Sequence, residues 1–489
     1  MKEEHESWET LEGLKPESVF KNFEKISQIP RGSGNEKGIS DFLLSFGKNL
    51  GLETIQDESL NIIIRKPATK GYENCPGVVL QGHMDMVCEK EKNVEHDFLK
   101  DPIKLRIDGD MIYATGTTLG ADNGIAVAMG MAILEDNTLE HPALEVLVTV
   151  NEEDGMNGAD ALDPSLIKGQ YILNMDSEEE GYLLVSCAGG KTCVVSLPVE
   201  YKKVEGDKQG LLVEVTGLLG GHSGMEIVLQ RANANKAIAR VLSVLNVDYE
   251  LASVDGGTKH NAIPREAKCV IAVNKADVES AKKQINDILT AFKHEFTTSD
   301  PGMTYSVAET SVDKVLTKDC KEKVVQMSCL TPHGVQSVSL DIEGLVESST
   351  NFAIIETKES TIEFLTSVRS SVMSIRDEIA DRIRLLAQAL GANYDLIAQY
   401  PAWEFKKGSK LEKICSETYE KLTGKVPTVM ALHAGLECGL LLDKLPHAEA
   451  ISIGPDMFDV HTPNEHVSIP SVANVWDYVI EILKSMNQY

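Results

Sequence analysis

Hydrophobic and polar positions follow a helical period in some parts of the chain and form short apolar runs in others. Residues 17–29 and 39–50 carry apolar side chains three or four positions apart, which predicts two amphipathic helices. Short apolar runs, which are typical of buried strands, occupy residues 78–81, 144–150, 171–174 and 450–453. Because these runs alternate with helices, the pattern predicts an α/β domain in which a mostly parallel sheet has helices on both faces.

The stretch from about Cys187 to Tyr400 has a different sequence pattern, since its strands alternate apolar and polar residues and its turns are frequent. This pattern is typical of an α+β unit with an antiparallel sheet. Within it, Ser374 has the position of an N-cap for a helix that ends at Gly391. We find no convincing internal repeat here or elsewhere in the chain.

The α/β pattern returns after Pro401, which indicates that the middle stretch is an insertion. A chain of 489 residues is long enough for two domains. We therefore expect residues 1–187 and 401–489 to form one discontinuous domain, and residues 188–400 to form a second domain inserted into it.

Charge and composition exclude several classes of partner. Lys and Arg number 47 and Asp and Glu number 75, so the formal net charge is −28, which disfavours binding to nucleic acid or to an anionic membrane. No run of 18 apolar residues is present, and Met1–Glu6 lacks the apolar core of a signal peptide. The Cys count is 9, an odd number, and no CxxC pair occurs, so we expect reduced thiols and a cytoplasmic protein.

Two adjacent acids, Glu152 and Glu153, come directly after one apolar run and before an Asp-Gly turn. Adjacent residues at a strand end point in different directions, so one carboxylate could bind a metal while the other faces a substrate. Taken alone, two solvated loop acids are the simpler interpretation, because most surface acids have no chemical role. The pair gains weight because other strand ends carry residues of the same kind.

Five further residues with ligand chemistry occupy comparable positions. His83 and Asp85 follow the first apolar run, and alternate residues of an extended chain lie on the same side. A histidine satisfied within its loop is the alternative for His83. Asp122 opens a nearly all-apolar helix, where simple capping is the alternative. Asp176 and His461 follow the last two runs.

Parallel strands place their carboxyl ends at one edge of a sheet, which is where the active sites of such sheets form. Two histidines and three or four carboxylates meeting there suit a borderline divalent ion, zinc first, with cobalt or manganese as alternatives. Two such ions, about 3.5–4 Å apart and bridged by one carboxylate and one water, form a hydrolytic site. A free glutamate beside them can act as general acid and base.

Five short segments carry a family resemblance. They are GHMD at 82–85, GADNG at 120–124, NEE at 151–153, NMD at 174–176 and HTPNE at 461–465. In this order across the chain, they resemble the signatures of the dinuclear-zinc aminoacylase/carboxypeptidase superfamily. The length, the large insertion and the HAGLECG stretch at 433–439 resemble the dipeptidase branch of that superfamily.

The resemblance implies a metal-binding role for the matching positions. His83 and Asp176 would hold one zinc, Glu153 and His461 would hold the other, and Asp122 would bridge the two.

The resemblance also implies catalytic and substrate-binding roles. Glu152 would be the general acid and base, and Asp85 would hydrogen-bond the first metal-binding histidine and fix its tautomer. His222 would help to stabilise the oxyanion, while Asn261 and Arg369 would hold the carboxylate end of the substrate. An ordinary surface ion pair is the alternative for Arg369.

Glu437 is assigned to the substrate-binding residues because it lies in the family-like stretch, but neither its role nor that of His433 follows from the chemistry of the residues. The resemblance implies a metallo-dipeptidase that hydrolyses unblocked Xaa-His and other dipeptides. Residues 188–400 would form its lid, and the family is compatible with a homodimer. A deacylase of N-acyl amino acids would need the same metals but no pocket for a free amine. A non-catalytic binding protein of this fold would be expected to lack Glu152 or a ligand.

Overall fold

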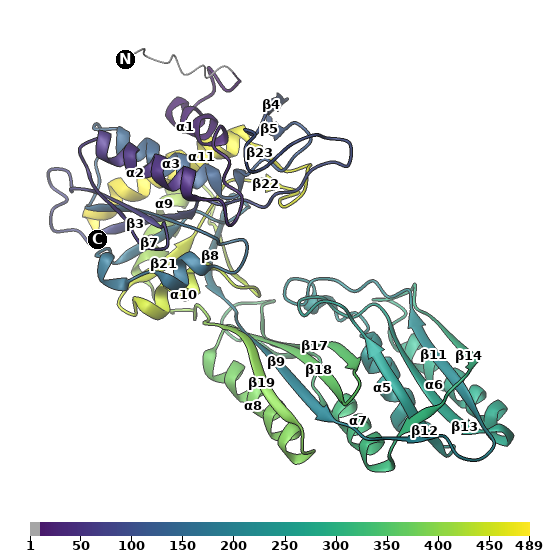
Figure 1. The fold of residues 1–489 in the computed structure, drawn as a ribbon. Helices are drawn as coiled ribbons and strands as arrows, with labels where there is room; N and C mark the ends of the chain where they lie inside the picture. The colour runs from purple at the N-terminus through teal and green to yellow at the C-terminus, as the bar shows by residue number, and fades with distance from the viewer. Residues whose placement is uncertain (1–9) are drawn as a thin grey trace. The chain divides into compact units, whose positions relative to one another are not determined.

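The computed structural model describes residues 10–489, so the N-terminal residues considered for a signal peptide, Met1–Glu6, lie outside it. The chain divides into two compact units, which are described separately (Figure 1). Unit 1 comprises residues 10–186 with Phe405–Ala431 and Leu436–Tyr489, and unit 2 comprises Cys187–Glu404 with Leu432–Gly435. Among the described residues, no helix is both long and apolar enough to cross a membrane.

An eight-stranded sheet forms the centre of unit 1. Its strands, in spatial order, are β1 (Glu53–Gln56), β2 (Ile62–Lys66), β6 (Leu144–Thr149), β3 (Val78–His83), β7 (Tyr171–Asn174), β21 (Glu449–Ser452), β8 (Tyr182–Cys187) and β20 (Thr428–Leu432). The four central strands, from β6 to β21, are parallel. The β1–β2, β2–β6 and β21–β8 pairs are antiparallel. Every residue of β3 and β6 is buried, which explains their continuous apolar character.

Helices cover this sheet, with α3 and α11 on one side of it and α10 on the other in Figure 1. The helices of unit 1 are α1 (Glu17–Ser27), α2 (Lys37–Asn49), α3 (Ala121–Glu135), α4 (Asn157–Ala161), α9 (Lys410–Thr423), α10 (Glu437–Lys444) and α11 (Ile469–Ser485). The all-apolar helix predicted from the sequence is α3, which is buried between β3 and α1. A small antiparallel sheet joins β22 (Met457–Phe458), β23 (His466–Ser468), β5 (Met111–Ala114) and β4 (Leu105–Asp108).

Unit 2 is built on a nine-stranded antiparallel sheet. In spatial order its strands are β14 (Thr304–Thr310), β11 (Lys208–Thr216), β13 (Ala267–Asn274), β12 (Tyr249–Gly256), β17 (Val346–Thr357), β18 (Thr361–Ser370), β9 (Gly189–Pro198) and β19 (Asn393–Tyr400), and β16 (Gly334–Val338) pairs with β17. A separate two-stranded ladder joins β10 (Tyr201–Lys203) to β15 (Lys314–Leu316).

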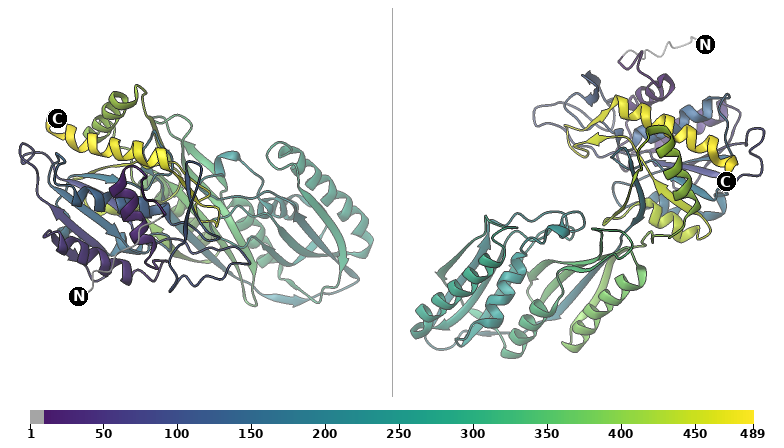
Figure 2. Two further views of the ribbon diagram at one scale, coloured as in Figure 1. Left: turned by 90° about the horizontal axis from the view of Figure 1, so that it is seen from above. Right: turned by 180° about the vertical axis from the view of Figure 1, so that it is seen from behind.

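The helices of unit 2 lie in one layer, as the view from behind in Figure 2 shows. They are α5 (Ala234–Val244), α6 (Val278–Glu295), α7 (Lys318–Leu330) and α8 (Met373–Ala389). In this layer α6 contacts α5, α5 contacts α7, and α7 contacts α8. Their apolar faces and the inner face of the sheet form one core.

Unit 2 contains an internal repeat that the sequence analysis missed. One half of the repeat lies in sequence between two parts of the other, so we call them the inner and the outer half. The inner half consists of β11, α5, β12, β13, α6 and β14, and the outer half consists of β9, α7, β17, β18, α8 and β19. Both follow the β-α-β-β-α-β order, and their strands stack in the same order from the β12–β17 junction outward. The outer half is interrupted by the inner one, so no fixed sequence period exists for a repeat search to find.

A second correction concerns the start of α8. Its N-cap is Val372, and Ser374 lies inside the helix, so the predicted serine cap is wrong. The chain leaves β18 at Ser370 and turns directly into the helix, and this tight connection starts the helix before the serine is reached.

Candidate metal centre

The carboxyl ends of the parallel strands carry the candidate ligands of unit 1. His83 is the last residue of β3, Glu153 lies in the turn after β6, and Asp176 lies two residues beyond β7. Asp122 lies in the first turn of α3, and His461 lies in the loop between β22 and β23. Since β3, β6 and β7 are parallel neighbours, their ends meet at one edge of the sheet. The structure thus brings the five predicted ligands together.

Asp122 lies between the two histidines of this cluster. Its Oδ1 is 3.1 Å from His83 Nε2, and its Oδ2 is 3.1 Å from His461 Nε2. The capping alternative does not apply, because the N-cap position of α3 is occupied by Gly120 and not by Asp122. A carboxylate that turns one oxygen toward each histidine has the arrangement needed to bridge two cations.

Two overlapping sets of side chains could each hold a cation. One set consists of His83, Asp122 and Asp176, and the other of Asp122, Glu153 and His461. Within each set the ligand atoms lie within 4.8 Å of one another. The sets share Asp122, so together they form a candidate dinuclear centre.

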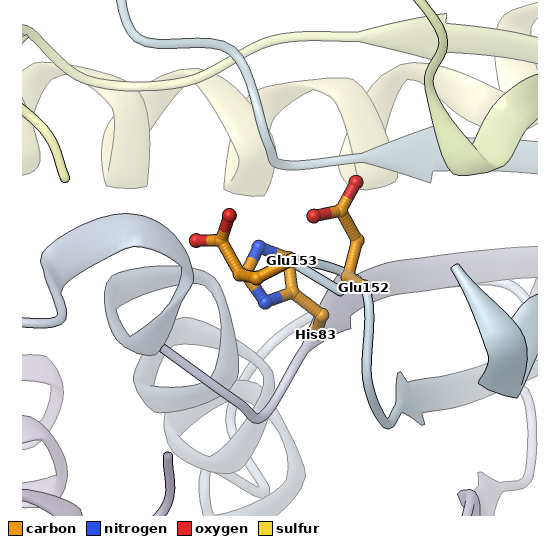
Figure 3. Close-up of side chains that lie close together, drawn as sticks. All are labelled: His83, Glu152 and Glu153. Atoms are coloured by element: carbon orange, nitrogen blue, oxygen red, sulfur yellow. The ribbon is translucent and has the colours of Figure 1, made fainter. Parts of the chain in front are cut away.

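Glu152 forms a third set with His83 and Glu153, whose ligand atoms also lie within 4.8 Å of one another. The expectation that the two adjacent glutamates point in different directions is wrong, because both carboxylates flank the His83 imidazole (Figure 3). The strand ends at Thr149, and the chain turns through Asn151 at a φ of 52°, so the alternation of an extended strand no longer holds. The two sets that share Asp122 do not include Glu152, which leaves its carboxylate available to carry a proton.

The fully buried carboxylate of Asp85 organises three of these groups. Its Oδ1 lies 3.3 Å from His83 Nδ1 and accepts the Glu152 backbone N–H at 3.0 Å. Its Oδ2 accepts the Glu153 N–H at 3.2 Å and the Ser33 hydroxyl at 2.8 Å. Burial alone would raise the pKa of Asp85, but its hydrogen bonds, that to His83 first, lower it. Asp85 therefore fixes both the imidazole and the turn that carries the two glutamates.

The cluster contains more acids than the protein's own cations can balance. Burial raises the pKa of Asp176 to about 7, with contributions in the same direction from the charges of Asp122 and Glu153 and an opposing one from His83. Burial and nearby carboxylates also raise the pKa of Glu152. Hydrogen bonds to Asp122 and Glu153 raise the pKa of His461 to about 11. All three raised pKa values indicate a surplus of negative charge.

These properties fit divalent cations. Carboxylate oxygens and imidazole nitrogens are ligands that zinc, cobalt and manganese accept. Asp176 Oδ1 is buried and has no hydrogen-bond partner among the described residues, although His83 Nε2 lies 3.3 Å away. Bound cations would satisfy this oxygen and neutralise the surplus charge.

Glu437 lies at the start of α10 and is fully buried. Its Oε2 accepts hydrogen bonds from Gln81 at 2.6 Å and from Thr149 at 2.7 Å, while its Oε1 has no partner among the described residues. Burial raises its pKa to about 7. In this arrangement it supports the ends of β3 and β6 and does not present its carboxylate at a surface, and its assignment to substrate binding stays a prediction.

The other substrate-binding residues predicted from the sequence belong to unit 2. His222 Nδ1 accepts the N–H groups of Gly224 at 3.3 Å and Met225 at 3.1 Å, and burial lowers its pKa. The ring is therefore neutral and carries its hydrogen on Nε2. The backbone carbonyl of Asn261 accepts the N–H of Ser223.

Arg369 is 9% exposed and donates from Nη1 to the Tyr400 hydroxyl at 2.6 Å. Its Nε has no hydrogen-bond partner among the described residues, and no carboxylate there forms an ion pair with it. The alternative of a surface ion pair is therefore wrong, because the guanidinium is buried and unpaired. A buried, unpaired guanidinium is suited to bind an anion.

The loop between α1 and α2 supports this cluster through contacts that were not predicted from the sequence. Arg31 donates to the Asp85 carbonyl, the Ser33 hydroxyl donates to the Asp85 carboxylate, and Glu36 accepts the Asn151 N–H at 3.1 Å. The segment has the small and polar composition of an exposed connection, and Arg31 and Glu36 are nevertheless buried. Composition alone gives no signal for such contacts, because they join residues far apart in the chain.

Comparison with known proteins gives matches over nearly the whole chain. The family model described as Peptidase family M20/M25/M40 matches residues 79–485. The cytosol non-specific dipeptidase of Escherichia coli (strain K12) is 36% identical over 479 residues, which are 97% of this chain and 99% of that protein. The crystal structure of aminoacylhistidine dipeptidase from Vibrio alginolyticus matches with a TM-score of 0.93 at 34% identity, over 98% of both chains.

A more distant match extends the likeness in fold alone. The crystal structure of aminopeptidase PepT from Bacillus cereus matches with a TM-score of 0.56 at 16% identity, over 97% of this chain and 99% of that chain. Together the matches confirm the fold class and the family resemblance expected from the sequence.

Proposed function

The chain belongs to peptidase family M20/M25/M40, and from this premise we propose that it is a metal-dependent dipeptidase acting on unblocked dipeptides, Xaa-His among them. The observation that carries the proposal is the position of Asp122 between two histidines, at the strand ends that also carry the remaining acids. The full-length likeness to two dipeptidases supports the choice of substrate class.

Two divalent cations, zinc first and cobalt or manganese as replacements, are the cofactors of this proposal. His83 and Asp176 would hold one, Glu153 and His461 would hold the other, and Asp122 would contribute to both. When bound, such cations supply Lewis acidity that activates water and polarises a carbonyl group.

Glu152 moves the proton in the proposed reaction. Its carboxylate takes a proton from the attacking water as the water oxygen bonds to the peptide carbonyl carbon. It then delivers that proton to the amine nitrogen as the carbon–nitrogen bond breaks, so the carboxylate is restored.

Unit 2 supplies recognition of the substrate in this proposal. Nε2–H of His222 donates to the carbonyl oxygen as negative charge develops on it. Arg369 pairs with the free carboxylate of the dipeptide, helped by Asn261. A carboxylate would give the buried guanidinium the partner that it lacks. Lengthening the substrate at this end would remove that carboxylate, which limits the length of the peptide.

The proposed setting is the cytoplasm, which is also the setting in the name of the Escherichia coli relative. No disulfide joins the cysteines of the described residues, which fits reducing surroundings. A homodimer stays a prediction from the family.

Hydrolysis of three matched substrates tests the proposal. Zinc-loaded protein is incubated with an unblocked Xaa-His dipeptide, with its N-acetylated form and with a tripeptide, and bound metal is counted in the same sample. Cleavage of the free dipeptide alone is expected. Preference for the acetylated compound would reassign the protein as a deacylase, and failure to cleave any of them at full metal occupancy would contradict a catalytic role.

A further inference from the structure

A buried arginine reaches from the loop after α1 to two segments of the metal centre. Arg31 is 2% exposed. Its Nη1 donates to the carbonyls of Met84 at 3.0 Å and Asp85 at 3.3 Å, and its Nη2 donates to the carbonyl of Gly120 at 2.5 Å. One guanidinium thus joins the chain beyond β3 to the segment that leads into Asp122. A single ammonium could not span these carbonyls with the same fixed geometry.

A buried glutamate forms hydrogen bonds with the backbone N–H groups of the same segment. Glu465 is 2% exposed, and its carboxylate accepts four consecutive backbone N–H groups, from residues 119–122, at 2.7–3.3 Å. It lies four positions beyond His461, in the same connection between β22 and β23. The contact therefore links the Asp122 segment to the loop that carries the second histidine.

The two charged groups grip residues 119–122 through different backbone atoms. Arg31 donates a hydrogen bond to a carbonyl, and Glu465 accepts hydrogen bonds from the N–H groups. Gly120 within this stretch and Gly124 just beyond it leave room for the guanidinium, because a Cβ on either would lie 2.6 Å from Arg31 Nη2. Neither charged side chain contributes an atom to the three sets of side chains that could hold a cation.

We propose that Arg31 and Glu465 form a backbone clamp that positions the Asp122 carboxylate between His83 and His461. The clamp acts on metal binding, because the bridging carboxylate must present both oxygens at once for two cations to bind side by side. Arg31 and Glu465 are positioning residues, and the inference rests on the proposed metal-dependent function.

Cobalt binding without substrate tests the clamp. The protein is stripped of metal, Co²⁺ is titrated in, and its visible absorption bands report both the affinity and the coordination. Arg31→Lys and Glu465→Gln are compared with Arg65→Lys. Arg65 is a matched control, since it also pairs with carboxylates and donates to a backbone carbonyl in unit 1, but it lies beside Glu145, near the opposite end of β6.

We expect both clamp variants to bind Co²⁺ about 10–100-fold more weakly than the wild type and to shift its absorption bands. The control is expected to bind with unchanged affinity and bands. Unchanged binding in both clamp variants, or equal losses in the clamp variants and the control, would overturn the proposal. Because no substrate is present, a failure of the dipeptidase assignment would leave this result unaffected.

Hydrogen exchange of the wild type extends the test to the case in which a variant does not fold. In metal-free protein, the amides of residues 119–122 should exchange as slowly as those of a buried strand, because Glu465 accepts all four. Exchange of these amides at the rate of an exposed loop would show that no clamp exists before metal binds, and would overturn the inference.

Discussion

Histidines occur in both units, and their surroundings shift the pKa in opposite directions. In unit 1, hydrogen bonds to Asp122 and Glu153 raise the pKa of His461 to about 11. In unit 2, burial lowers the pKa of His433 to about 3, and the nearby Arg369 contributes in the same direction. The first region gathers acids and attracts cations, whereas the second keeps its imidazoles neutral around a guanidinium and attracts anions.

This difference shows how one residue type serves two tasks. At the strand ends of unit 1, neighbouring carboxylates favour a positive charge on the imidazoles. A bound metal would supply that positive charge in place of the proton. In unit 2, His222 and His433 are uncharged, so they can donate or accept hydrogen bonds without repelling the guanidinium. In the proposed function, the acidic region carries out the reaction and the basic region binds the free carboxylate.

Loss of the proton carrier gives the largest expected effect and would remove the reaction from the acidic region. Glu152→Gln keeps the shape of the side chain but cannot take up the proton, so kcat should fall by about 10²–10⁴-fold. Steady-state kinetics on a free dipeptide, with bound metal counted in parallel, measures this. Glu420→Gln, an exposed position on α9, is the control. Retention of wild-type kcat at full metal occupancy would exclude Glu152 as the base.

Metal removal should give the second-largest effect, a change in amide exchange that is confined to unit 1. Cations held at 100 times their dissociation constant stabilise the state that binds them by about 2.7 kcal/mol, or about 100-fold in protection. We expect a chelator to speed amide exchange in the strand-end loops of unit 1 and to leave the sheet of unit 2 unchanged. Hydrogen exchange read by mass spectrometry follows both regions at once. Equal changes in both would contradict a metal centre confined to unit 1.

The proposed binding of the substrate carboxylate depends on Arg369. Arg369→Met keeps the length of the side chain but removes its charge, and a hydrogen bond to a charged group contributes about 1.5–3 kcal/mol, so kcat/KM should fall roughly 10- to 100-fold. A dipeptide amide, which has no free carboxylate, should be cleaved equally poorly by the wild type and by the variant. An undiminished preference for the free carboxylate in the variant would refute the pairing.

The smallest effect concerns the pH dependence of stability in unit 2. The pKa of His433 is about 3 in the folded chain and near 6.5 in an unfolded one. Between these values the unfolded chain binds a proton that the folded chain does not, so stability falls as the pH falls, by at most about 1.4 kcal/mol per pH unit.

Replacement of this imidazole should flatten that pH dependence. His433→Gln can still hydrogen-bond to Ser349, which lies 2.7 Å from His433 Nε2. Denaturant unfolding of both proteins at pH 7 and pH 5 is the measurement, and the wild type should lose more stability between the two values. Identical losses would show that His433 is protonated equally in the folded and unfolded states.

The catalytic fold and the ligand cluster were accessible from the sequence for a physical reason. Strands buried on both faces are continuous apolar runs, and the residue after such a run lies at the edge of the sheet, so His83 and Asp176 could be placed without coordinates. The direction of a side chain within a turn could not, because it depends on local φ angles. That is why the expected divergence of Glu152 and Glu153 was wrong.

Contacts between segments that are far apart in the chain also could not be predicted from the sequence. Arg31 and Glu465 meet one backbone segment from positions more than 400 residues apart in the chain. Neither residue differs in composition from an ordinary loop charge, and only folding reveals that both are buried. The repeat within unit 2 was hidden in a similar way, because one copy interrupts the other.

The nesting of one half of unit 2 inside the other has a consequence for synthesis on the ribosome. β9 emerges early, but its neighbours β18 and β19 follow only after the whole inner half has been made. Chains fold in units as they emerge, so we expect the contiguous inner half to fold while β9 is still unpaired. The short β10–β15 ladder then brings the two ends of the finished insertion together. More than a hundred residues separate β9 from the rest of the outer half, and folding of the inner half makes them equivalent to a short loop. The entropic cost of bringing β9 to β18 and β19 is then lower.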